Sequence, residues 1–250
     1  MWVRRRNAGM YDVMYGESSG ERLDIFPTRQ PHAPLIVFIH GGWWRALDKS
    51  DFSLIAPAFT NAGFNVALTN YTLAPEASIE EIVQQQLRAL SWLYKDSEKY
   101  DIDRDRIIVI GHSAGAHLAA MMMAAQWPLY DRELPADLIK AGVLLSGLYD
   151  LAPIMHANFV NVDLQMTEQR VMPLSPAWMP LQQKIPFITG MGGKESDEFK
   201  RQTDLIGQRW AGQHRQQIEL PECNHLSICD ALADSDSTLF KATLALTKSL

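Results

Sequence analysis

A serine near the middle of the chain carries the sequence pattern of an activated nucleophile. Ser113 is the centre of Gly111-His112-Ser113-Ala114-Gly115, which fits G-x-S-x-G. The motif follows a β-branched run at 106–110 and precedes a predicted helix at 117–125, so its glycines allow a sharp strand-to-helix turn that presents the hydroxyl above a sheet. The helix N-terminus also places positive potential where an oxyanion would form. Ser113 is therefore the predicted nucleophile, and an incidental serine in a glycine-rich turn is the alternative.

A second glycine motif is typical of an oxyanion hole. His40-Gly41-Gly42-Trp43-Trp44 follows the apolar run 35–39, which is typical of a strand covered on both faces. Two consecutive glycines let backbone N–H groups approach a ligand without intervening side chains. We assign the oxyanion donors to the N–H groups of Gly42, Trp43 and Ala114. An ordinary tight turn is the alternative interpretation.

A serine hydroxyl needs a positioned imidazole to take its proton, and His225 is the best candidate among seven histidines. In a fold of this kind the chain order is serine, acid, histidine. His225 meets this requirement because it follows the last predicted strand, 215–220. The other histidines are assigned to the motif turns (His40, His112) or to a structural role (His117), and His156 stays open as a substrate contact.

The acid that orients the imidazole should come from the loop after the predicted strand 185–190. Three carboxylates compete in that loop: Glu195, Asp197 and Glu198. Spacing alone does not decide among them, and a charge cluster at a helix start is usually a solvated cap. We favour Glu195, which lies nearest the end of the strand, with Asp197 as the runner-up.

The elements that must position these groups alternate between strand and helix along the chain. The predicted strands cover 22–26, 35–40, 64–70, 106–110, 139–146, 185–190 and 215–220, and the predicted helices cover 52–61, 78–95, 117–125, 198–212 and 237–248. This alternation predicts an α/β fold with a mostly parallel sheet and helices on both faces. No linker divides the chain, so we expect one domain over 1–250, with the irregular stretch 149–184 as a small lid.

Composition excludes several classes of function. The 250 residues carry 23 Lys and Arg against 29 Asp and Glu, a net charge of −6, and phosphate binding needs clustered basic charge, so nucleic acid is disfavoured as a partner. The basic run Arg4-Arg5-Arg6 lacks the apolar stretch of a signal peptide, and no apolar run reaches membrane-spanning length. Cys223 and Cys229 are expected to be reduced thiols in a cytoplasmic protein. Neither a metal nor a cofactor is expected, because His-Glu-x-x-His spacing is absent from the sequence.

Seven tryptophans are the unusual feature of the composition. An apolar wall that accepts an aromatic small-molecule substrate could be built from large side chains near the motifs and in the lid. The candidates are Trp43, Trp44, Trp178, Phe159 and Met155. Ordinary core packing is the alternative for each of them.

With these residues the chain resembles the α/β-hydrolase superfamily and, within it, the serine-dependent arylformamidase (kynurenine formamidase) group. The resemblance runs from about Tyr11 to Leu232 and is carried by both glycine motifs and by further matches at 70–75, 146–151, 192–199 and 224–225. It implies an α/β-hydrolase fold and cleavage of an aryl formamide similar to N-formylkynurenine, or of a small ester, through an acyl-enzyme. It also places the acid at Glu195, where some members carry Asp. Lys194 departs from the acidic residue expected in bacterial relatives.

Two other functions compete with this interpretation. A general carboxylesterase for short-chain or aryl esters would use the same catalytic residues, so the sequence leaves formamide and ester substrates open. A catalytically inactive hydrolase fold used as a binding module would normally have lost a triad member, whereas Ser113, a nearby carboxylate and His225 are all present. A homodimer is a further expectation.

Overall fold

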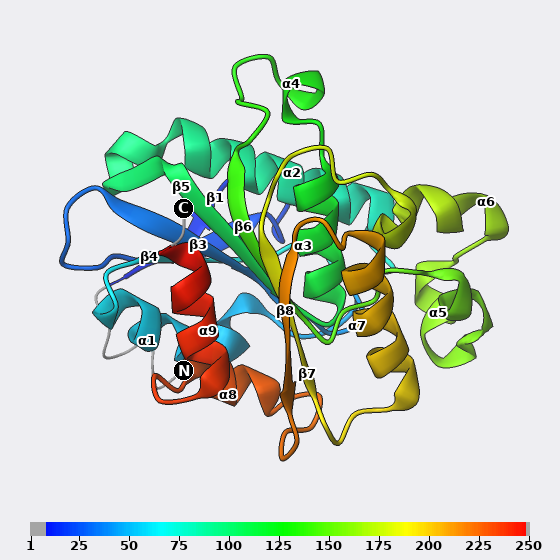
Figure 1. Cartoon of the computed structure of the whole chain (residues 1–250). Coiled ribbons are helices and arrows are strands. Elements are labelled where there is room, and N and C mark those ends of the chain that lie inside the picture. Colours follow the sequence, from blue (N-terminus) through cyan, green and yellow to red (C-terminus); the bar gives the residue numbers. More distant parts are fainter. Residues whose placement is uncertain (1–8, 249–250) are drawn as a thin grey trace.

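An eight-stranded sheet forms the centre of the computed structural model, which describes residues 9–248 (Figure 1). The strand order is β1-β2-β4-β3-β5-β6-β7-β8. Strand β2 runs antiparallel to both of its neighbours, and the strands from β4 to β8 along this order are parallel to one another. The strands are β1 (Met10–Met14), β2 (Arg22–Phe26), β3 (Ala33–Ile39), β4 (Asn65–Thr69), β5 (Ile102–His112), β6 (Ile139–Leu145), β7 (Phe187–Gly192) and β8 (His214–Leu220). The predicted α/β fold with a mostly parallel sheet is confirmed.

The central strands bury side chains on both faces. Along β3, Leu35, Val37 and Ile39 belong to one hydrophobic core, and Ile36 and Phe38 belong to the other. This alternation explains why the run is continuously apolar, since each face of the sheet is covered. The first core is covered by α2 (Ile79–Lys95), α3 (Ala114–Ala124) and α7 (Asp197–Arg209), and the second by α1 (Ala56–Asn61), α8 (Ile228–Ala233) and α9 (Thr238–Thr247) (Figure 1).

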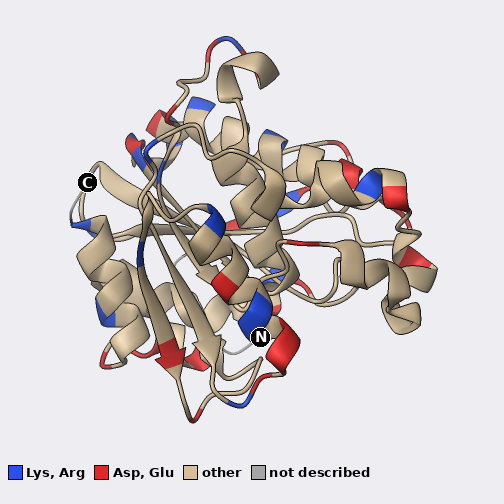
Figure 2. Ribbon diagram, turned by 45° about the vertical axis from the view of Figure 1, so that its right-hand side comes forward, with Lys and Arg blue, Asp and Glu red and all other residues tan. Residues whose placement is uncertain are grey.

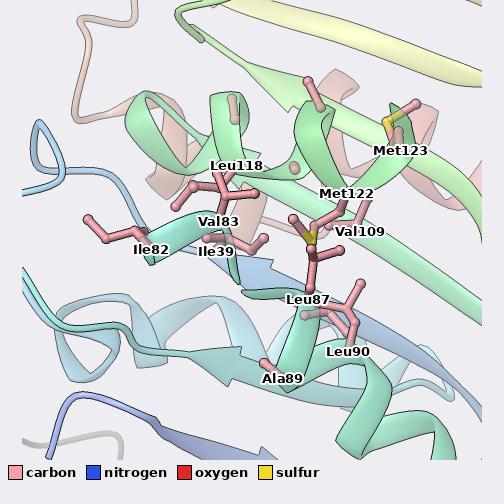
Figure 3. Close-up of a cluster of buried hydrophobic side chains, with 14 of the residues drawn as sticks. Ile39, Ile82, Val83, Leu87, Ala89, Leu90, Val109, Leu118, Met122 and Met123 are labelled. Atoms are coloured by element: carbon pink, nitrogen blue, oxygen red, sulfur yellow. The ribbon is translucent and has the colours of Figure 1, made fainter. Parts of the chain in front are cut away.

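Helix α3 is fixed inside the first core. Residues of α2, including Leu87 and Leu90, gather with Met122 of α3 around Val109 of β5 (Figure 3). The hydroxyl of Ser78 accepts a hydrogen bond from the amide of Glu81 and begins α2 as expected. Because α3 follows the G-x-S-x-G motif directly, this packing holds the turn that carries the motif.

Short helices occupy the chain between β6 and β7. We call residues 152–178 the insert, which consists of η3 (Ala152–His156), α5 (Asn158–Leu164), α6 (Glu168–Val171), η4 (Met172–Leu174) and η5 (Pro176–Trp178). Its helices α5 and α6 lie at one side of the molecule, beyond α3 and α7 (Figure 1). Two ion pairs join the insert to the rest of the chain, Arg170–Glu80 and Asp163–Arg45. The remaining short helices are η1 (Lys49–Ile55), η2 (Ser97–Tyr100) and α4 (Trp127–Tyr130).

Several elements differ from the sequence prediction. Strand β1 and helix α8 were not predicted, and β5 extends beyond the predicted 106–110. The expected helix 52–61 is divided into the 3₁₀ helix η1 and the α-helix α1. Asp48 and Asp51 form a capping box that begins η1 at residue 49. Pro57 stands in the first turn of α1 and has no amide proton, so it cannot continue a helical hydrogen-bond ladder from η1.

Charged residues of both signs are interspersed over the view in Figure 2. Within residues 9–248, no helix is both long enough and apolar enough to span a membrane. The basic run Arg4–Arg6 lies outside the described residues. Cys223 and Cys229 are free thiols, as predicted.

Candidate active site

Ser113 lies in a strained turn between the last residue of β5 and the first residue of α3. Its backbone angles are φ 56° and ψ −122°, outside the regions that residues with a side chain usually adopt. A Cβ added to Gly115 would stand 2.0 Å from the carbonyl oxygen of Ile39, and one added to Gly111 would stand 2.2 Å from the carbonyl oxygen of Gly115. Both glycines are therefore required by close backbone approach, as the motif predicted.

A line of hydrogen bonds joins the three predicted triad residues. The Nδ1 atom of His225 lies 2.7 Å from Oε2 of Glu195, and its Nε2 atom lies 2.9 Å from Oγ of Ser113. An ionised carboxylate can only accept a hydrogen bond, so Nδ1 carries the proton and Nε2 is free to accept the serine hydroxyl. This is the tautomer that a general base at His225 requires.

The carboxylate of Glu195 is enclosed by hydrogen-bond donors. Its Oε1 atom accepts a bond of 2.6 Å from the hydroxyl of Ser146 and another of 2.6 Å from the amide of Gly192. Burial by itself raises the pKa of Glu195, but the hydrogen bonds from His225, Ser146 and Gly192 outweigh it, so the pKa lies below its ordinary value. The side chain of Asp197, the runner-up, is fully exposed at the start of α7.

The predicted oxyanion turn has positive backbone φ angles and is held in place by a neighbouring hydrogen bond. Gly42, Trp43 and Trp44 all have positive φ, at 109°, 55° and 57°. A Cβ on Gly42 would stand 2.1 Å from the carbonyl oxygen of Ala46. His40 immediately precedes Gly41, and the Nε2 atom of its ring forms a hydrogen bond with the side chain of Asn70. The turn also contacts the nucleophile, because a Cβ on Gly41 would stand 2.8 Å from Cβ of Ser113.

The aromatic candidates separate into different environments. Trp43 contacts Phe159 of α5 edge to face, with ring centroids 5.3 Å apart, so two of the candidates meet beside the oxyanion turn. Met155 packs against the first core as a partly buried residue. The structure does not bring all five together.

Two of the predicted substrate contacts lie away from the site. Trp44 is completely buried and packs edge to face on His117, so its indole supports the turn from within the core and does not face a ligand. Trp178 lies over the guanidinium of Arg209, at the opposite end of α7 from Asp197. A helix of this length separates its ends by about 18 Å, so the structure does not place Trp178 beside Ser113.

Two residues that the sequence analysis did not assign lie in the site. Ser146 follows the last residue of β6, the neighbour of β5 in the sheet, and only its place in a family motif drew attention to it. Phe199 lies on α7 with its ring centroid 4.2 Å from that of His225 and 6.2 Å from that of Trp43. In the sequence, its place in the first turn of α7, four residues after Glu195, was the feature that could have indicated its position in the site.

The mostly parallel sheet, the strained serine turn and the Glu195–His225–Ser113 line define an α/β-hydrolase. The sequence profile of BD-FAE matches residues 23–152, and the chain belongs to this family. It is similar to kynurenine formamidase of Danio rerio, at 31% identity over 94% of this chain and 80% of the relative. It is also similar to a probable isoprenylcysteine α-carbonyl methylesterase of Oryza sativa subsp. japonica, at 30% identity over 56% of this chain and 35% of the relative.

Solved structures show the same fold. A putative thioesterase from Silicibacter sp. has a TM-score of 0.81 and 29% identity, covering 96% of this chain and 87% of that one. An inhibited esterase B from Lactobacillus rhamnosis has a TM-score of 0.79 and 18% identity, covering 99% and 92%. Together with the family assignment, these relatives establish the chain as a hydrolase of the serine-hydrolase type.

Proposed function

We propose that the chain cleaves an aryl formamide similar to N-formylkynurenine, with Ser113 as nucleophile, His225 as general base and Glu195 as the acid of the triad. The observation that carries the proposal is the unbroken hydrogen-bond line from Glu195 through His225 to Ser113, at 2.7 Å and 2.9 Å. The formamidase of Danio rerio, which aligns with 94% of the chain, supports the choice of substrate.

The proposed reaction has two steps. The Ser113 oxygen attacks the formyl carbonyl while His225 takes the hydroxyl proton. The N–H groups of Gly42, Trp43 and Ala114 hold the tetrahedral oxyanion. His225 then gives its proton to the aryl amine as the C–N bond breaks, which leaves a formyl ester on Ser113. Water, deprotonated by His225, hydrolyses this ester to formate and free serine.

Three aromatic rings support an aromatic substrate. Phe199 lies against the ring of His225, and Trp43 lies between Phe199 and Phe159. Flat apolar faces so close to the base suit the ring of a leaving aryl amine. Ser113 itself is only 2% exposed, and Phe159 of the insert contacts Trp43 of the oxyanion turn. In this proposal the insert shields the acyl-enzyme from bulk water as a lid.

A small ester is the second candidate substrate, and a general carboxylesterase would use the same triad. The similarity to a plant methylesterase at 30% identity favours it. Measuring kcat/KM for N-formylkynurenine and for p-nitrophenyl acetate separates the two. A kcat/KM that is several orders of magnitude higher for the formamide supports the first proposal. A kcat/KM for the formamide that is equal to or lower than that for the ester supports the esterase.

The triad is tested separately from the substrate. Ser113→Ala should abolish hydrolysis of both compounds and labelling by a fluorophosphonate probe. Unchanged hydrolysis in this variant would overturn the assignment of the nucleophile, and a folded wild-type protein that resists labelling would support a binding module. The homodimer and the cytoplasmic location stay predictions, and light scattering at several concentrations tests the first of them.

A further inference from the structure

His112 makes a contact that the triad does not require. This residue precedes Ser113 in the chain, and its Nε2 atom lies 2.6 Å from the backbone carbonyl oxygen of His225. A carbonyl oxygen only accepts, so Nε2 of His112 carries the proton and donates it. The side chain is 1% exposed, and its ring centroid lies 4.8 Å from that of His225.

Two adjacent residues of the strained turn, His112 and Ser113, therefore both form hydrogen bonds with His225. Ser113 binds the ring of His225 at Nε2, and His112 binds the main chain of His225 at its carbonyl oxygen. The first bond must break and re-form as the proton moves during the reaction. The second is not involved in proton transfer and persists throughout.

The loop that carries His225 is partly exposed to solvent. It joins β8 to α8, and its neighbours Asn224 and Leu226 are exposed to solvent. The side chain of Asn224 accepts hydrogen bonds from the amides of Leu226 and Ser227, which shapes the loop internally. These bonds do not attach the loop to the turn that carries the nucleophile, whereas the bond from His112 does.

The other ring nitrogen of His112 makes no competing hydrogen bond. Its Nδ1 atom is buried and has no hydrogen-bond partner among residues 9–248, and it faces Gly41, where an added Cβ would stand 3.3 Å from it. Burial, followed by the nearby imidazole of His225, lowers the pKa of His112 to about 3. The ring is therefore neutral at ordinary pH and places a donor beside His225 without adding a second positive charge.

We propose that His112 is a positioning residue, whose Nε2–H fixes the main chain of His225 and thereby aligns the imidazole with the hydroxyl of Ser113. The proposal rests on the proposed triad. A misplacement of about 1 Å in a catalytic group is enough to lower the rate by about a hundredfold, so loss of this bond should reduce kcat while KM changes little.

Three substitutions distinguish the donor from the ring. His112→Gln places an amide nitrogen close to the position of Nε2, and His112→Asn places one near Nδ1, where no acceptor lies. His112→Phe keeps a ring without any donor. We expect the Gln variant to keep kcat within about fivefold of the wild type, and the Asn and Phe variants to lose about a hundredfold in kcat and in the rate of fluorophosphonate labelling.

His214→Phe is the matched control. The Nε2 atom of His214 lies 3.0 Å from the hydroxyl of Thr189, and His214 is the first residue of β8, whereas the loop of His225 follows the other end of that strand. This variant should lose stability and keep kcat, which separates a lost hydrogen bond from a misplaced base. Near-UV circular dichroism and thermal unfolding report whether each variant is folded.

Folded Asn and Phe variants with wild-type kcat and labelling rates would overturn the proposal, as would an equal loss in the Gln variant. If these variants do not fold, nitrogen-15 spectra of the wild-type histidines decide, since the proposal requires the Nε2–H tautomer at His112 and an Nδ1–H tautomer refutes it. Failure here is distinguishable from failure of the triad. An active Ser113→Ala variant overturns the triad. If Ser113→Ala is inactive and His112→Phe is fully active, only the positioning role of His112 is overturned.

Discussion

Ser146 donates a hydrogen bond of 2.6 Å to Oε1 of Glu195 from the end of β6, the strand between β5, which Ser113 follows, and β7, which Glu195 follows. The other carboxylate oxygen of Glu195 accepts from His225. Each oxygen therefore has its own donors, and the carboxylate cannot rotate without losing at least one of them. A glutamate side chain has one more rotatable bond than aspartate, so these hydrogen bonds are needed to keep its carboxylate in one orientation toward His225.

Ser146→Ala should lower kcat/KM by about 10- to 150-fold, because a hydrogen bond to a charged group contributes about 1.5–3 kcal/mol and about 1.4 kcal/mol corresponds to a factor of ten. Steady-state kinetics with p-nitrophenyl acetate measures the change. Ser175→Ala is the control. This buried serine accepts a hydrogen bond from the amide of Leu151 and donates one to the carbonyl of Val171, and it is not bonded to Glu195. An equal loss in both variants would contradict a specific role for Ser146.

Glu195→Gln should reduce kcat by about 10²–10⁴-fold, because an amide no longer stabilises the imidazolium and can favour the wrong tautomer of His225. Asp197→Asn should leave kcat unchanged, since the Asp197 side chain is fully exposed. The two variants are compared under identical conditions with the same substrate. The assignment of the acid is wrong if Asp197→Asn is the more damaging change.

Gly42→Ala should lower kcat by about 10²–10³-fold, the loss typical of one oxyanion donor. The added methyl group would stand 2.1 Å from the carbonyl oxygen of Ala46, at a residue whose φ is +109°, so the turn must move. Gly212→Ala meets nothing within 4 Å and serves as the control. A Gly42→Ala variant that is folded and fully active would exclude this turn from the oxyanion hole.

Phe159→Ala should raise KM for an aryl formamide by about 2–10-fold, the equivalent of one aromatic contact of about 0.5–1.5 kcal/mol, with little change in kcat. Phe159 contacts Trp43, whereas Val162 on the same helix is 69% exposed. Val162→Ala should therefore leave KM unchanged. The measurement is a full kinetic comparison of both variants, and equal KM values for Phe159→Ala and the wild type would remove Phe159 from the substrate pocket.

Stability should fall as the pH decreases from about 6.5 toward 4. Burial lowers the pKa of His117 to about 4, while an unfolded histidine has a pKa of about 6.5. Between these values the unfolded chain binds a proton that the folded chain does not, so stability is fully present above the unfolded pKa and is lost as the pH falls through the folded pKa. His117→Gln should make this decline shallower by up to about 1.4 kcal/mol per pH unit. Urea unfolding at several pH values measures the slope, and identical slopes would contradict the prediction.

The meeting of Ser113, Glu195 and His225 was predictable from the sequence because it depends on where parallel strands end. β3, β5, β7 and β8 end at Ile39, His112, Gly192 and Leu220, and each predicted functional group follows one of these ends within a few residues. Parallel strands end at one edge of the sheet, so residues distant in sequence meet there. The glycines marked the turns, chain order selected His225 and the loop of the acid, and closeness to the end of the strand favoured Glu195 within that loop.

The environments of the aromatic residues were not predictable in the same way. Trp44 follows Trp43 directly, yet one indole is fully buried and the other contacts Phe159. Their directions depend on positive φ angles at both residues, which no periodic pattern encodes. The position of Trp178 depends on how the insert packs against α7, a contact between segments that sequence spacing does not determine. Strand β1 is an edge strand whose burial alternates, but two of its exposed positions are Met10 and Met14, so the sequence shows no alternation of apolar and polar residues.

The insert holds none of the three proposed triad residues, since Ser113, Glu195 and His225 all lie outside residues 152–178. Its ion pairs, Arg170–Glu80 and Asp163–Arg45, attach it through side chains that take no part in proton transfer. In the proposed function the insert contributes Phe159 to the substrate pocket, whereas Trp43 and Phe199 come from segments outside it. Exchanging the codons for 152–178 would therefore change one wall of the proposed pocket and leave the three proposed triad residues in place.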